Sequence, residues 1–151
     1  MFKFIVNTTG KSNSGSVVYS KEENSFDFIP SRNADIIMLL GYLHVGIDSE
    51  TMSVQQVWGL SPFESWNKKA LIIPAFSVGE LLLDGDLQPG MTYRIAGSET
   101  WTTNFDSKSG WFCVGDCETI RTDNVIEFAN NSVAVISDGL LKALWLRPAI
   151  E

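Results

Sequence analysis

The chain has 151 residues, enough for one domain with its own core but hardly for two. Eighteen acidic residues against eleven basic ones give a formal net charge of −7. Because nucleic-acid and anionic-membrane binding both depend on Lys and Arg, this balance argues against either as a partner.

The first residues predict β-structure. Phe2, Phe4 and Val6 alternate with polar residues over 2–8, which is the period of a half-buried strand. A run of turn-forming residues at 10–15 separates it from a second strand at 17–20. The two segments therefore predict an N-terminal hairpin.

The middle of the chain reads as short strands separated by turns. The apolar run at 35–40 is too short for its periodicity to distinguish strand from helix. Strands are expected at residues 25–29, 43–47, 53–58, 70–73, 80–84 and 91–95.

The last fifty residues carry the clearest signals. A loop ending in Gly110 predicts a hairpin between 101–105 and 111–114. Asn130-Asn131 and Asp138-Gly139 are tight-turn pairs that tolerate positive φ. They predict an antiparallel meander of strands at 124–129, 132–137 and 140–147.

The expected fold is therefore all-β, or β-rich α+β, with at most one or two short helices. A single domain over residues 1–151 would hold antiparallel strands in a curved sheet, a sandwich or a barrel. Neither a signal peptide nor an apolar run long enough to cross a membrane is evident, so a cytoplasmic location is expected.

Catalytic chemistry has little material in this sequence. His44 is the sole histidine, and it lies between apolar residues in a predicted strand, where a hydrogen-bonded packing role is expected. Cys113 and Cys117 could supply only half a zinc site, and a reduced pair with Cys113 facing inward is expected. We predict no catalytic residue, no metal and no cofactor.

Acidic residues are concentrated in the second half, where residues 76–151 carry eleven acids and five bases. Such a surface either solubilises the protein or meets a cationic partner. Among the tryptophans, Trp58, Trp111 and Trp145 lie inside predicted strands and are expected in the core. The candidate partner-binding residues, chosen for charge, loop position or possible exposure, are Asp84, Asp86, Asp116, Glu118, Asp123, Trp66 and Trp101.

A resemblance adds to this interpretation. It rests on Gly110–Asp116, on Val125–Phe128 with the following Asn130-Asn131, and on Asp138–Pro148, which contains LKALWLRP. Together these stretches resemble small immunity proteins of bacterial contact-dependent growth inhibition and related polymorphic toxin systems. The resemblance implies cytoplasmic neutralisation of one cognate toxin, often a nuclease. Since the residues offer no catalytic constellation, we expect a non-enzymatic inhibitor, acting as a monomer in a 1:1 complex. A nuclease active site is typically basic, so an acidic surface could block it.

Two other classes of function remain open on the sequence. A tryptophan-lined concavity with paired carboxylates would suit a carbohydrate- or ligand-binding domain, or a carboxylate-based hydrolase. A structural subunit of a larger assembly would instead show a large apolar patch on an edge strand.

Overall fold

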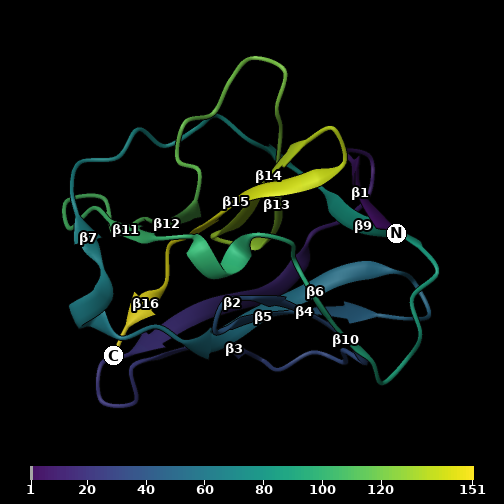
Figure 1. Cartoon of the computed structure of the whole chain (residues 1–151), viewed down its shortest axis with the longest axis horizontal. Coiled ribbons are helices and arrows are strands. Elements are labelled where there is room, and N and C mark those ends of the chain that lie inside the picture. The colour runs from purple at the N-terminus through teal and green to yellow at the C-terminus, as the bar shows by residue number, and fades with distance from the viewer. Residues whose placement is uncertain (1) are drawn as a thin grey trace.

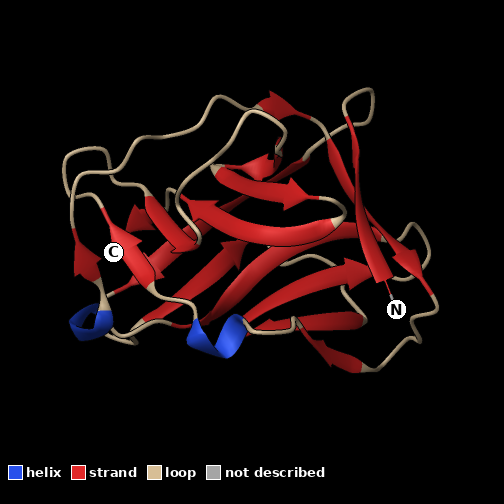
Figure 2. Cartoon of the chain, turned by 45° about the horizontal axis from the view of Figure 1, so that its top comes forward, coloured by secondary structure: helices blue, strands red, loops and turns tan. Residues whose placement is uncertain are grey.

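A strongly curved sheet makes up most of the molecule, and its strands wrap around the main interior (Figures 1 and 2). The computed structural model describes residues 2–151, so Met1 of the predicted domain lies outside the described part. Strands account for 53% of the chain and short helical turns for 4%, which confirms the predicted fold class. The sheet is mixed and curls into a half-barrel.

The elements follow one another in short steps. In chain order they are β1 (Phe2–Asn7), β2 (Asn13–Ser20), β3 (Ser25–Ile29), β4 (Ile36–Leu40), β5 (Leu43–Asp48), β6 (Ser53–Leu60), the 3-10 turn η1 (Phe63–Ser65), β7 (Asn67–Lys68), β8 (Ser77–Val78), β9 (Glu80–Gly85), β10 (Thr92–Arg94), the 3-10 turn η2 (Ser98–Thr100), β11 (Thr103–Phe105), β12 (Phe112–Gly115), β13 (Asn124–Asn130), β14 (Ser132–Ser137), β15 (Leu140–Leu146) and β16 (Ala149–Ile150).

The sheet order places the two halves of the chain in one continuous surface. From one edge to the other the strands run β10-β4-β5-β6-β3-β2-β13-β14-β15-β12-β11-β7, and the β2–β13 junction is parallel. The ambiguous run at 35–40 forms β4, whose alternate residues Ile36, Met38 and Leu40 face the core. The alternating burial of its side chains therefore shows that this run is a strand, although its continuous apolar sequence could not distinguish strand from helix.

The N-terminal hairpin prediction is wrong. β1 pairs antiparallel with β9, far along the chain, while β2 pairs with β3, β13 and β16. Glycine and serine residues between β1 and β2 separate the two strands instead of joining them as a hairpin. Distant pairing of this kind leaves no local signal in the sequence.

The C-terminal meander is confirmed. β13, β14 and β15 pair antiparallel in succession. Asn131, Asp138 and Gly139 all adopt the positive φ that tight hairpin turns require.

Both faces of the meander are buried, which gives the molecule a second, smaller core. Trp111, Cys113 and Trp145 belong to this core, on the opposite side of the sheet from the main interior. Leu71 and Ile73 pack over it from an irregular segment. The strand predicted at 70–73 is therefore wrong: its apolar side chains cover a sheet face without joining the sheet. Within residues 2–151 no helix is long and apolar enough to cross a membrane.

Candidate functional site

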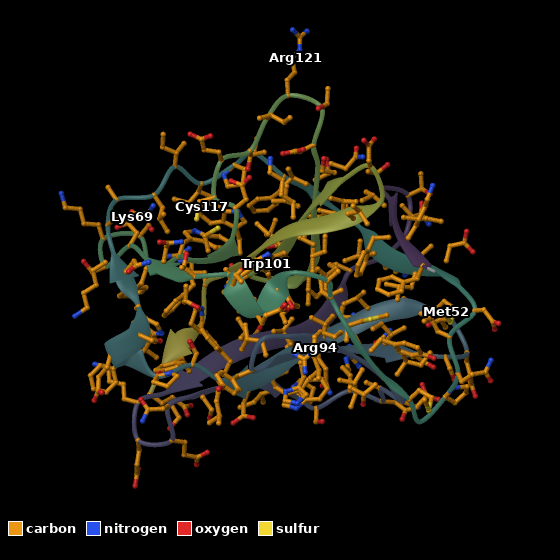
Figure 3. All side chains as sticks on the ribbon, in the orientation of Figure 1. Met52, Lys69, Arg94, Trp101, Cys117 and Arg121 are labelled. Carbon is orange, nitrogen blue, oxygen red and sulfur yellow. The ribbon has the colours of Figure 1, made fainter. Side chains whose placement is uncertain are left out.

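A groove of about 980 Å³ opens where the β4–β5 turn and the end of β6 face η2 and β11. Trp101 and Arg94 both line it, and Figure 3 labels Trp101 beside the short green helical turn and Arg94 over the lower part of the sheet. Its volume lies at the upper end of the range typical of small-molecule pockets. We call it the aromatic groove and define it by Glu23, Asp27, Tyr42, His44, Trp58, Arg94, Glu99 and Trp101.

The aromatic wall of the groove comes from two adjacent strands. His44 of β5 stands directly opposite Trp58 of β6, and their rings stack with centroids 5.2 Å apart and planes 11° from parallel. Their sequence neighbours Val45 and Val57 point into the main core, so this pair faces outward. The expectation of a core position for Trp58 is therefore wrong.

His44 also departs from its expected role. It is only partly buried, and among the described residues its Nδ1 atom has no hydrogen-bond partner. A packing histidine would have satisfied that nitrogen. The imidazole instead presents one flat face to Trp58, and its unsatisfied nitrogen is itself buried.

Gly59 allows the β4–β5 turn to lie close to the aromatic wall formed by His44 and Trp58. Its φ of +135° is strained for any residue with a side chain, and a Cβ there would lie 2.4 Å from the carbonyl oxygen of Tyr42. The same Cβ would lie 3.1 Å from Nδ1 of His44. Glycine is thus required for β6 to pass close beneath the β4–β5 turn, whose Tyr42 is 77% exposed.

The charge of the groove is predominantly negative. Glu23, Asp27 and Glu99 are exposed on its lining, and Arg94 is the one guanidinium that the described lining contains. Tyr42, Trp58 and Trp101 line the same groove. Aromatic faces attract cations, and carboxylates do so directly, so the groove is suited to a Lys or Arg side chain.

Of the seven predicted binding residues, only Trp101 lines the groove. It is partly buried against the main core, and Gly115 leaves room for it, since a Cβ there would lie 3.0 Å from the indole ring. Trp66 packs deeper, with its ring centroid 4.5 Å from that of Phe112 and its indole N–H donating to Ser61 Oγ at 3.0 Å.

The predicted acidic residues divide between two other places. Asp84 and Asp86 are exposed at the end of β9, beside the N-terminal strand at the right of Figure 1. Asp116, Glu118 and Asp123 lie on the long loop between β12 and β13 that rises at the top of Figure 3, where Arg121 is labelled. The five acids therefore do not form one contiguous face.

Asp123 has an internal role on that loop. Its side chain is fully buried, and its Oδ2 accepts hydrogen bonds from Lys142 Nζ at 2.7 Å and from the Ile120 amide at 2.9 Å. Burial raises the pKa of the Asp123 carboxyl, but these bonds outweigh it and the net pKa is lowered. The Asp123 carboxylate is thus bound by groups of the protein itself and is not presented to solvent.

Sequence reasoning missed most of the groove. Glu23 and Asp27 lie in the half of the chain whose charge is nearly balanced, so counting charge by region drew attention away from them. One usable signal was the register of His44, because its sequence neighbours Leu43 and Val45 are both apolar. In residues 2–151 no three His, Cys, Asp or Glu side chains gather as metal ligands.

Comparison with known proteins adds no assignment. No protein-family model matches the chain, and no curated protein matches its sequence significantly.

Proposed function

We propose that this protein is a non-catalytic inhibitor of the immunity class, which binds a cognate toxin by taking a cationic segment of it into the aromatic groove. The observation that carries the proposal is the combination, on one concave surface, of exposed carboxylates with three aromatic side chains. Asp27 and Glu99 supply charge, while Tyr42, Trp58 and Trp101 supply rigid contact area. Aromatic anchors of this kind are enriched at binding hot spots.

The acidic character of the groove suits a nuclease as the toxin. A nuclease that grips phosphate needs Lys and Arg in its active-site cleft, and those are the side chains that this groove would accept. Opposite charges also steer encounter, so association would be fast at low salt and slower as ionic strength rises. The inhibitor would need no chemistry of its own.

Growth protection tests this function directly. The chain would be co-expressed with a candidate toxic domain taken from a neighbouring reading frame, and survival compared with that of cells carrying an empty vector. We expect restored growth and a 1:1 complex on gel filtration. If soluble protein gives no protection, the immunity assignment fails.

A small-ligand function is a second candidate for the same groove. Trp58, stacked on His44, lines the groove together with carboxylates, and aromatic side chains with a few placed polar groups are typical of small-molecule sites. Titration with neutral oligosaccharides while tryptophan fluorescence is followed would separate the two functions. Saturable quenching that is lost in Trp58→Ala would favour the ligand, whereas an unchanged spectrum would favour the protein partner.

A further inference from the structure

We propose that Cys117 is an oxidation site and that Cys113 is its resolving thiol, so that a hydroperoxide converts the pair into an intramolecular disulfide. This proposal stands apart from the aromatic groove and holds whatever binds there. It rests on how the two sulfur atoms are placed, on what surrounds Cys117, and on the different exposure of the two residues.

The turn after β12 brings the two thiols together. Cys113 lies on β12 and is fully buried, while Cys117 is four residues further and partly exposed. Gly115, between them, has a φ of +108°, and a Cβ there would lie 2.7 Å from the carbonyl oxygen of Lys142. The chain folds back after Gly115, so that Cys117 packs against the cluster that contains Cys113. Asn104 lies between the two residues, because its Nδ2 donates to the Cys113 carbonyl oxygen at 3.4 Å and to Cys117 Sγ at 3.1 Å.

The surroundings of Cys117 favour its thiolate. Asn104, which is 4% exposed and stands opposite Cys113 across the β11–β12 pair, donates from Nδ2 to Cys117 Sγ at 3.1 Å. Lys69 lies on the same side of the molecule, and its ammonium acts on the sulfur through space (Figure 3). The Cys113 thiol, Lys69 and Asn104 together lower the pKa of Cys117 to about 7, against the raising effects of burial and Asp116.

Cys113 is suited to the second step. The neighbouring Cys117 thiol, burial and the nearby negative charge raise the pKa of Cys113. Because Cys113 is buried, an oxidant in solution reaches Cys117 first. Once Cys117 has become a neutral sulfenic acid, the negative charge that held the proton on Cys113 is gone.

The chemistry balances in two steps. The Cys117 thiolate attacks the outer oxygen of a hydroperoxide, the O–O bond breaks, and the products are a sulfenic acid and, after protonation, an alcohol or water. The Cys113 sulfur then attacks the sulfenic sulfur, an S–S bond forms, and the hydroxyl leaves with the Cys113 proton as water. Cys117 is oxidised by two electrons in the first step, and the pair shares that oxidation in the second.

Treatment of the full chain with hydrogen peroxide tests the proposal. We expect peptide mapping of the wild type to show a Cys113–Cys117 disulfide within one chain. In Cys113→Ala, the sulfenic acid of Cys117 should persist and be trapped by dimedone. Cys117→Ser should leave Cys113 unmodified, since that thiol is buried.

Alkylation by iodoacetamide isolates the role of Lys69. Half-maximal reaction of Cys117 is expected near pH 7, where an ordinary cysteine would require a higher pH of about 8.5. Lys69→Met should slow the reaction at neutral pH about threefold, because less thiolate is present. Lys68→Met, which removes the adjacent exposed charge, is the matched control and should have little effect.

Three results would overturn the proposal. In the first, the peroxide-treated wild type keeps both thiols free or forms only disulfides between chains. In the second, Cys117→Ser consumes peroxide as fast as the wild type. In the third, Lys68→Met slows alkylation as much as Lys69→Met does. The wild-type mapping needs no variant to fold, so the proposal can be refuted even if Cys113→Ala is unstable.

Discussion

Gly59 is the backbone position on which the shape of the aromatic groove depends most. Gly59→Ala should destabilise the protein by about 3 kcal/mol, because a methyl group at φ +135° collides with the Tyr42 carbonyl. The measurement is urea unfolding followed by circular dichroism.

Gly90→Ala is the matched control: Gly90 also has a positive φ, but no atom lies within 4 Å of its added Cβ. It should cost only about 1 kcal/mol. Equal losses in the two variants would show that the close approach at Gly59 does not matter.

Asp106 links the β11–β12 turn to the irregular segment around Leu71, which packs over the second core. Its Oδ2 accepts from the Leu71 amide at 3.0 Å and its Oδ1 from the Lys108 amide at 2.9 Å. These bonds, that from Leu71 first, lower the pKa of the Asp106 carboxyl. The stabilisation is therefore complete above the unfolded-state pKa of about 4 and is lost as pH falls through the folded-state value.

Asp106→Asn should accordingly lower Tm at neutral pH and flatten the acid side of the profile of stability against pH. Thermal unfolding at a series of pH values down to the acid transition measures both effects. Ser107→Ala, a change at the exposed neighbouring position, is expected to leave the profile as in the wild type. If stability varies with pH in Asp106→Asn as it does in the wild type, the Asp106 carboxylate does not supply this pH-dependent stabilisation.

The loop between β12 and β13 is held by the buried pair of Asp123 and Lys142. Lys142→Met removes the cation but leaves a buried carboxylate that has lost one of its hydrogen-bond donors. We expect a loss of about 2 kcal/mol or more in the free energy of unfolding. Because the folded-state pKa of Asp123 is lowered, the contribution of the pair should disappear as pH falls through that value.

A double variant separates the ion pair from simple packing. Asp123→Asn combined with Lys142→Met leaves no buried charge, so it should be more stable than Lys142→Met alone. Chemical denaturation of the single and double variants at neutral pH gives the comparison. A double variant less stable than Lys142→Met would mean that the cation is not what supports the buried carboxylate.

The sequence predicts the strands better than it predicts their partners. Alternation marks β1, and the Asp138-Gly139 turn marks the β14–β15 hairpin, because both signals are local. The pairing of β1 with β9 depends on contacts across most of the chain and leaves no such mark. The apolar run at 70–73 predicts a strand that does not form, because hydrophobic side chains can be buried against a sheet without their backbone joining it.

The candidate site was harder to predict than the fold. His44 and Trp58 share a face because β5 and β6 pair in that register, and Glu23 and Glu99, far apart in the sequence, line the same groove. Of the acids chosen for charge and loop position, Asp84 lies at the end of β9 and Asp116 on the loop between β12 and β13. Charge counted along the chain therefore located acidic segments but not the concave site.

The molecule is a curled mixed sheet that presents an acidic, aromatic groove. Reversal of charge inside this groove should therefore weaken partner binding more than a comparable change elsewhere on the surface. Asp84 and Asp86 supply a natural comparison, because both are exposed acids outside the groove. Exposed charges of this kind can be reversed with little effect on folding.

The most direct test is the dissociation constant of the purified toxic domain for three forms of the chain, measured by calorimetry at low and at physiological salt. We predict that Glu23→Lys with Asp27→Lys and Glu99→Lys weakens binding at least a hundredfold and removes most of its salt dependence. Asp84→Lys with Asp86→Lys should change it by less than about threefold. Wild-type affinity in the folded groove variant would contradict the account.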